Sequence, residues 1–230
     1  MHPSTLPADL LARMTARRGR PYAFPRLDPR RTALAVIDMQ NVFVAPGAVA
    51  EVPTAREIVA NINQLARVVR DAGGRVAWVQ THVDPDEPGG GWPVLFGEIF
   101  DAALARGYLA GLTPGSEGHR LWSALETDPG DLFVGKTRFS AFLPGACDLP
   151  DQLALLGIDT VLIAGTLTNV CCESSARDAM MRGFRVVMVG DANATRNDAE
   201  HMASLVAIHQ VFGDVRSTAE TIALLSQSPA

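Results

Sequence analysis

The chain has 230 residues, of which 47% are hydrophobic, and a formal net charge of −5 at pH 7. This length and apolar content are enough for one sizeable core, and the absence of basic blocks argues against nucleic-acid or membrane binding. No apolar run approaches the roughly 20 residues of a membrane-spanning helix, and three cysteines, two of them adjacent, make no disulfide framework. We therefore expect a cytoplasmic protein.

The N-terminal 30 residues contain several prolines and arginines and a short helical pattern at 8–18. They are expected to form an arm over a single domain of residues 31–230. Within that domain, apolar runs rich in β-branched residues alternate with helical patterns. The expected strands are 32–37, 75–81, 131–134, 159–164 and 184–189, with a helix at 54–72 and a last helix from Thr218.

Strands separated by helices imply right-handed crossovers and a parallel sheet that is covered on both faces, so the predicted fold is a doubly wound, three-layer α/β fold. Ligands of such sheets collect at the carboxyl ends of the strands. Asp38, Lys136 and Cys171 each follow one of these strands. We expect the three side chains to converge on one edge of the sheet.

The cysteine lies at a predicted junction between a strand and a helix. Gly165 is expected to end the strand, and Thr168 or Asn169 to cap the helix. Cys171 would then lie in the first turn, where free N–H groups and the helix dipole favour a thiolate and can bind an oxyanion. Free cysteines more often pack as small hydrophobes, and Cys172 points about 100° away around the helix. Position alone does not decide whether Cys171 is a nucleophile or a packing residue, nor which of the two cysteines faces the pocket.

A cysteine nucleophile needs a group that takes its proton and later returns one to a leaving amine. Asp38 is the candidate for this role, and Lys136 is the cation that would hold Asp38 and stabilise the thiolate. A strand-end ion pair without chemistry is the structural alternative.

Three competing motifs are weaker. Residues 130–137 match the phosphate-binding pattern G-x-x-x-x-G-K-[ST], but the intervening residues are themselves a predicted strand, so we reject nucleotide binding. His82, Asp84 and Asp86 lack the partners that would complete a metal site, so no metal is expected. His201 and His209 are expected to be one surface and one packed histidine. No G-x-S-x-G elbow is present, which leaves the thiol as the best nucleophile.

The longest irregular segment, residues 82–92, contains Gly89, Gly90 and Gly91 and is followed by an apolar stretch at 93–97. A loop of this kind near strand ends is a candidate lid. Trp92 would then cover a substrate, or alternatively fill an oligomer interface; both interpretations stay open.

Three separated motifs together resemble the isochorismatase-like cysteine hydrolases, a family that includes nicotinamidases, N-carbamoyl amidohydrolases and ureidoacrylate amidohydrolases. The motifs are Ala35-Val-Ile-Asp38-Met-Gln40-Asn41, Lys136-Thr-Arg-Phe-Ser-Ala-Phe142 and the segment from Gly165 through Cys171 to Ala179. The resemblance implies a six-stranded parallel sheet with an Asp38–Lys136–Cys171 triad, and it selects Cys171 over Cys172. It also implies a cis peptide bond at Thr166–Leu167, with an oxyanion hole formed by the N–H groups of Leu167 and Cys171.

The reaction implied by the resemblance is attack of Cys171 on an amide, ureido or carbamoyl carbonyl, followed by hydrolysis of the thioester, with no cofactor. The sequence lacks the D-x-H metal site of nicotinamidases, and its cysteine argues against the vinyl-ether hydrolysis of true isochorismatases. The alternatives are a lactam-opening enzyme of the streptothricin-hydrolase kind and a non-catalytic binding protein of the same fold.

Pocket residues are expected close to the motifs. The candidate substrate contacts are Gln40, Asn41, Trp92, Arg138 and Thr166. Arg138 would bind a substrate carboxylate or form a surface salt bridge, whereas Phe142 is expected in the core. Since family members usually assemble, we expect a homo-oligomer, a dimer or a tetramer, whose ligand is a small molecule.

Overall fold

A computed structural model describes residues 1–226 of the protein. Its centre is a six-stranded sheet in the order β3-β2-β1-β4-β5-β6, and every neighbouring pair is parallel. The strands are β1 (Thr32–Ile37), β2 (Arg75–Thr81), β3 (Leu132–Lys136), β4 (Thr160–Thr166), β5 (Arg185–Ala194) and β6 (Asp214–Arg216). The strand order reverses direction at β1 and β4, which is the topology of a doubly wound sheet, as predicted.

Helices connect the strands. They are α1 (Ala8–Arg18), α2 (Asn41–Val44), α3 (Val59–Asp71), α4 (Ala102–Leu112), α5 (Leu149–Leu155), α6 (Glu173–Met181), α7 (Asp198–Ala207) and α8 (Thr218–Ser226). Short π-helical turns occupy Leu95–Ile99, Thr168–Cys172 and Ile208–Phe212. Across residues 1–226, none of the helices has the length and apolarity needed to cross a membrane.

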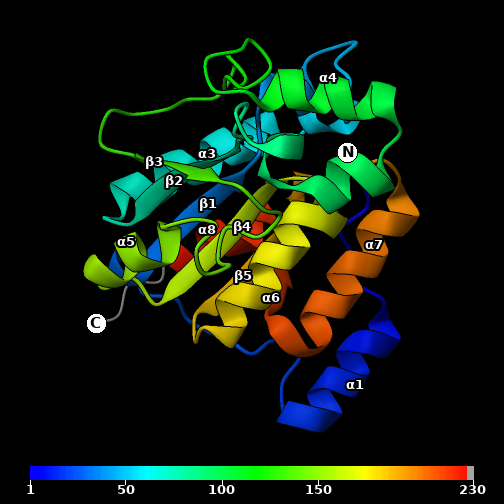
Figure 1. Ribbon diagram of the computed structural model, residues 1–230. Coiled ribbons are helices and arrows are strands. Elements are labelled where there is room, and N and C mark those ends of the chain that lie inside the picture. The colour runs from blue at the N-terminus through cyan, green and yellow to red at the C-terminus, as the bar shows by residue number, and fades with distance from the viewer. Residues whose placement is uncertain (227–230) are drawn as a thin grey trace.

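Helices cover both faces of the sheet, so that it forms the middle of three layers (Figure 1). Alternate residues of β1 point to opposite faces. Leu34 and Val36 belong to one buried cluster together with residues of α3 and α8. Ala33, Ala35 and Ile37 belong to a second cluster with residues of α1, α5, α6 and α7. All six residues of β1 are therefore buried, which explains its unbroken apolar sequence.

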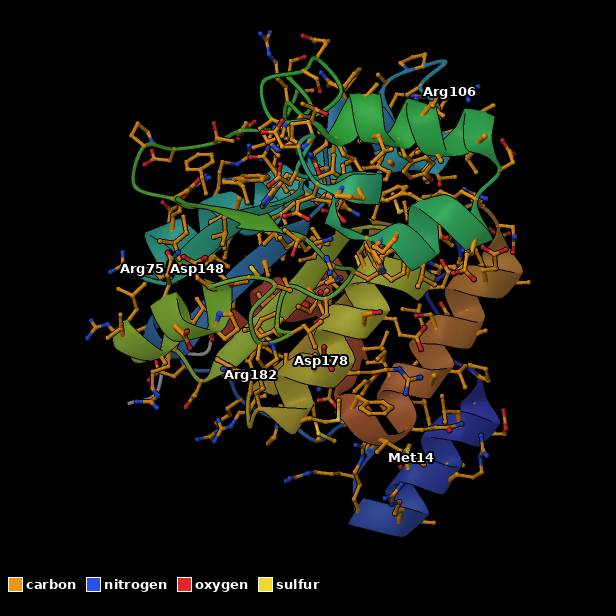
Figure 2. The ribbon with its side chains drawn as sticks, in the orientation of Figure 1. Met14, Arg75, Arg106, Asp148, Asp178 and Arg182 are labelled. Carbon is orange, nitrogen blue, oxygen red and sulfur yellow. The ribbon has the colours of Figure 1, made fainter. Side chains whose placement is uncertain are left out.

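The N-terminal segment lies along the second face. Leu10 and Met14 of α1 are buried in that cluster, and Figure 2 shows Met14 where α1 meets the end of α7. His2 is also buried, with Nδ1 2.6 Å from Asp198 Oδ1 and Nε2 2.9 Å from Thr195 O. These contacts tie residues 1–18 to the start and the end of α7.

Several element boundaries differ from the sequence prediction, and β3, β4 and β5 all end later than expected, at Lys136, Thr166 and Ala194. The predicted helix at 54–72 begins later, because Pro53–Arg56 forms a 3-10 turn and the α-helix starts at Val59. Gly165 does not end its strand, since β4 continues to Thr166. Gly165 adopts φ +118°, and a Cβ atom there would lie 2.0 Å from Ile37 O. Glycine thus allows β4 to approach β1 closely at the residue that precedes Asp38.

Replacing Gly165 with alanine should destabilise the protein by about 3 kcal/mol or more, because the new methyl group would overlap backbone atoms of β1. Gly145→Ala is the matched control, since Gly145 also has a positive φ but has no atom within 4 Å of the added Cβ. It should cost only about 1–2 kcal/mol. Urea unfolding of both variants measures the difference, and equal losses would contradict the close approach.

Candidate active site

Asp38, Lys136 and Cys171 meet at the carboxyl edge of the sheet. Lys136 Nζ donates a hydrogen bond to Asp38 Oδ2 at 2.8 Å and lies 3.5 Å from Cys171 Sγ. Lys136 is the last residue of β3, Asp38 follows β1, and Cys171 lies in the π-helical turn after β4. All three residues are buried. The structure therefore brings together the three groups that the sequence placed at strand ends.

The Asp38 carboxylate is held by both of its oxygens. Oδ1 accepts hydrogen bonds from the backbone N–H of Thr81 at 3.0 Å and from its hydroxyl at 2.9 Å, while Oδ2 accepts from Lys136. Asp38 has φ +51°, a left-handed conformation that is uncommon outside glycine, and Thr166 Oγ1 donates to its backbone carbonyl at 2.9 Å. The sharp turn after β1 thus aims the carboxylate at the end of β2.

Lys136 is charged in spite of its burial. Its ammonium group also contacts the Thr81 hydroxyl and donates to Arg138 O at 3.2 Å. Burial is the largest single influence and lowers the pKa of Lys136, but the charges and hydrogen bonds of Asp38 and Cys171 together outweigh it, so the net pKa lies above its ordinary value. The site therefore holds a permanent cation between the carboxylate and the sulfur.

Burial raises the pKa of the Cys171 thiol well above its ordinary value, and the negative charge of Asp38 adds to this effect, whereas Lys136 opposes it only in part. The expectation that the helix end favours a resting thiolate is therefore wrong. Neither predicted cap forms: Thr168 Oγ1 lies 2.9 Å from His201 Nδ1, and Thr195 donates to Asn169 Oδ1. The resting site pairs a neutral thiol with a carboxylate that can accept its proton.

Alkylation tests this protonation state. At pH 7.5, iodoacetamide should modify Cys171 at least about 10-fold more slowly than it modifies an unstructured cysteine peptide, because only the thiolate reacts. The rate should rise about 10-fold per pH unit from pH 8 to 10, since deprotonation increases with pH while the pKa stays above that range. Peptide mass mapping separates Cys171 from Cys147, whose pKa burial raises to about 11. Rapid labelling of Cys171 at pH 6 would contradict a neutral resting thiol.

The bond between Thr166 and Leu167 is a cis peptide, the conformation that the family resemblance implied. Leu167 and Cys171 both line the cavity described below. Their assignment as oxyanion-hole donors stays a prediction.

A cavity of about 430 Å³ opens onto Cys171. Trp92, one of the expected substrate contacts, lines it and packs against Phe139 with their ring centres 4.5 Å apart. Arg196, just before α7, and Glu200, in the first turn of α7, are further lining residues. Arg196 lies beside Tyr108, whose pKa is raised by burial and lowered in part by this guanidinium. The cavity thus lies between Cys171 and segments that are distant from it in sequence.

The other four expected substrate contacts do not line this cavity, because other parts of the protein bind their polar groups. Gln40 donates to the carbonyls of Thr81 and His119, and its Oε1 accepts from Thr81 N. Asn41 donates to Glu117. Thr166 binds the backbone of Asp38.

Arg138 is the fourth of these residues. It donates to Thr137 O and Gly91 O, and its guanidinium lies 5.0 Å from the centre of the Trp92 ring. It therefore supports the wall from outside the cavity that opens onto Cys171. Among residues 1–226 it makes no salt bridge, and its contact with a substrate carboxylate stays a prediction.

Sequence reasoning missed several residues of the site. Thr81 hydrogen-bonds to both Asp38 and Lys136, and its position at the carboxyl end of β2 was a usable signal. A further signal went unused for Lys136, which was predicted: it is the only lysine of the sequence, and the other basic side chains of this class are all arginines. Tyr108 and Arg196 reach the cavity from α4 and from the segment before α7, for which the sequence carried no signal.

The competing motifs have structural explanations. Residues 132–136 of the phosphate-binding pattern form β3, as expected, so they cannot wrap a phosphate. Within residues 1–226, no group of three or more His, Cys, Asp or Glu side chains is arranged to hold a metal ion. His201 and His209 are both fully buried, so the expectation of one surface histidine is wrong.

The sequence matches the isochorismatase domain over residues 32–220. Two relatives, each named ureidoacrylate amidohydrolase RutB, come from Methylobacterium radiotolerans and Caulobacter vibrioides. The first is 32% identical over 219 residues, which cover 89% of this protein and 84% of the relative. The second is 33% identical over 213 residues, which cover 87% of this protein and 93% of the relative.

Solved structures agree with this relationship. A cysteine hydrolase from Pseudomonas syringae pv. phaseolicola 1448A has a TM-score of 0.78 at 29% identity, covering 89% of this protein and 96% of the hydrolase. The nicotinamidase/pyrazinamidase PncA from Bacillus subtilis has a TM-score of 0.70 at 25% identity, covering 81% of this protein and 100% of PncA. Since the domain match and the relatives span most of the sequence, the protein belongs to the isochorismatase family of hydrolases.

Proposed function

We propose that the protein is a cysteine-dependent amidohydrolase that cleaves the C–N bond of an amide, ureido or carbamoyl compound through a thioester. The observation that carries the proposal is the buried cluster of Asp38, Lys136 and Cys171, in which Cys171 lines a cavity. The names of the two relatives support hydrolysis of a C–N bond.

In the first half-reaction, Cys171 Sγ forms a bond to the substrate carbonyl carbon while the thiol proton passes to Asp38. The carbonyl oxygen, now carrying the negative charge, accepts hydrogen bonds from the N–H groups of Leu167 and Cys171. Collapse of this intermediate breaks the C–N bond, and Asp38 returns the proton to the departing nitrogen. Ammonia or an amine leaves, and the acyl group stays on sulfur.

In the second half-reaction, Asp38 takes a proton from a water molecule whose oxygen attacks the thioester carbon. The C–S bond then breaks, and the proton passes from Asp38 to the Cys171 sulfur, which restores the thiol. Lys136 keeps the carboxylate in place through both steps, and its charge offsets the negative charge that moves between oxygen and sulfur. Every proton in this cycle is exchanged between substrate, water and the two residues.

The test is release of ammonia from a panel of ureido acids, carbamoyl amino acids and simple carboxamides, with lactams followed by mass change. Turnover of at least one acyclic member of the panel by the wild type, together with an acyl adduct on the Cys171 peptide, is the expected result. Turnover of lactams alone would replace the proposal with the lactam-opening alternative. Binding without any turnover would favour the non-catalytic alternative.

A further inference from the structure

The cavity above Cys171 has a wall that is rich in aromatic side chains. Six aromatic side chains line it: Phe43, Trp92, Phe96, Phe100, Tyr108 and Phe139. Adjacent ring centres are 5.9 Å apart for Phe96 and Phe100, 4.9 Å for Phe100 and Tyr108, and 6.3 Å for Tyr108 and Phe43. Four of the rings therefore form one continuous apolar surface.

This aromatic wall is anchored in the core. Phe43, Phe96 and Tyr108 are buried, and all three belong to the large hydrophobic cluster that includes α3 and α8. Tyr108 lies on α4, which crosses above the edge of the sheet in Figure 1, and Arg106 of the same helix points away from the sheet in Figure 2. The side of α4 that contributes to the cavity is therefore its apolar side, and the charged side faces outward.

The size and chemistry of the cavity match a ligand larger than a short polar acid. A volume of about 430 Å³ lies in the range of roughly 300–1,000 Å³ that is typical of sites for drug-sized ligands. Apart from His82, the titratable lining residues away from Cys171 are Tyr108, Arg196 and Glu200; Arg196 lies just before α7 and Glu200 in its first turn. Most of the remaining wall is apolar. Such a wall contributes favourable binding free energy only when it covers apolar surface of the ligand.

We propose that the substrate is an amide or carbamoyl compound with an aromatic or similarly bulky apolar body, which packs against the rings while its carbonyl lies at Cys171. This inference rests on the proposed function and specifies its substrate class. Small ureido acids, the class that the names of the relatives suggest for those proteins, would leave most of the aromatic wall without a contact.

The primary test is a series of amides with the same reacting group. From acetamide through butyramide to hexanamide, kcat/KM should rise about fourfold per methylene, because each buried CH₂ contributes about 0.8 kcal/mol to transition-state binding. The kcat/KM for phenylacetamide should exceed that for acetamide by about 100-fold or more. Likewise, kcat/KM should be higher for N-carbamoylphenylalanine than for N-carbamoylglycine. Equal values across either series, or a preference for the smaller compounds, would overturn the inference.

A pair of variants assigns the preference to the aromatic wall. Phe100→Ala should lower kcat/KM for phenylacetamide at least about 10-fold and for acetamide less than about threefold. Phe133→Ala is the matched control, since Phe133 lies on β3, is 52% exposed and does not line the cavity. It should change neither value. Equal effects of Phe100→Ala on both amides would contradict the assignment.

Calorimetric binding to Cys171→Ala separates failure of this inference from failure of the proposed function, because binding needs no turnover. If this variant binds phenylacetamide much more tightly than acetamide while the wild type hydrolyses neither, the apolar preference stands and the proposed reaction is wrong. If the wild type hydrolyses amides but this variant binds both compounds equally, the reaction stands and the preference is wrong.

Discussion

Replacing Cys171 with alanine is expected to abolish turnover, with a decrease in kcat of at least about 10⁴-fold. The alanine has no atom that can form the thioester, and the neighbouring ion pair of Asp38 and Lys136 cannot substitute for it. Because the thiol is buried and neutral at rest, its removal leaves no unpaired charge, and the fold should survive. The measurement is steady-state ammonia release from the substrate that the panel identifies.

Cys172→Ala is the matched control for this experiment. Cys172 is fully buried in the second hydrophobic cluster and, unlike Cys171, does not line the cavity. Its replacement should cost about 1 kcal/mol of stability and change kcat less than about threefold. If Cys172→Ala removed activity while Cys171→Ala kept it, the nucleophile would be misassigned.

Replacing Lys136 with methionine is expected to lower the free energy of unfolding by about 3–5 kcal/mol, because it leaves the Asp38 carboxylate buried without its cation. Activity should fall with it, since an unpaired carboxylate is protonated more easily and then cannot take the thiol proton. Urea unfolding measures the first effect and kcat the second. The matched surface control is Arg31→Met, whose exposed pair with Asp159 should be worth at most about 1 kcal/mol.

A double-mutant cycle separates the ion pair from simple packing. Asp38→Asn in the Lys136→Met background removes the buried charge, so the double variant should be more stable than the sum of the single losses predicts. Additive losses would show that Lys136 contributes by packing alone.

Elements with a regular pattern and clear limits were the most predictable part of the fold. The limits of β1, β2 and α1 agree with the predicted ranges 32–37, 75–81 and 8–18. Each is a regular pattern bounded by polar residues, proline or glycine, and such local signals persist in the tertiary structure. The prediction failed where a local signal was overruled: Gly165 looked like a strand end, but it lies inside β4 because β1 passes too close for a side chain.

The convergence of Asp38, Lys136 and Cys171 was determined by the sequence itself, because parallel strands bring their carboxyl ends to a common edge however far apart they lie in the sequence. The protonation of Cys171 was decided only by the tertiary structure, since burial beside Asp38 outweighs the local effect of a helix end. The tertiary structure also decided which residues form the wall of the cavity. Gln40 and Asn41 belong to a motif but bind distant backbone carbonyls, whereas Tyr108 and Arg196 reach the site from outside every motif. Proximity in sequence does not determine where a side chain points; the packing of distant segments does.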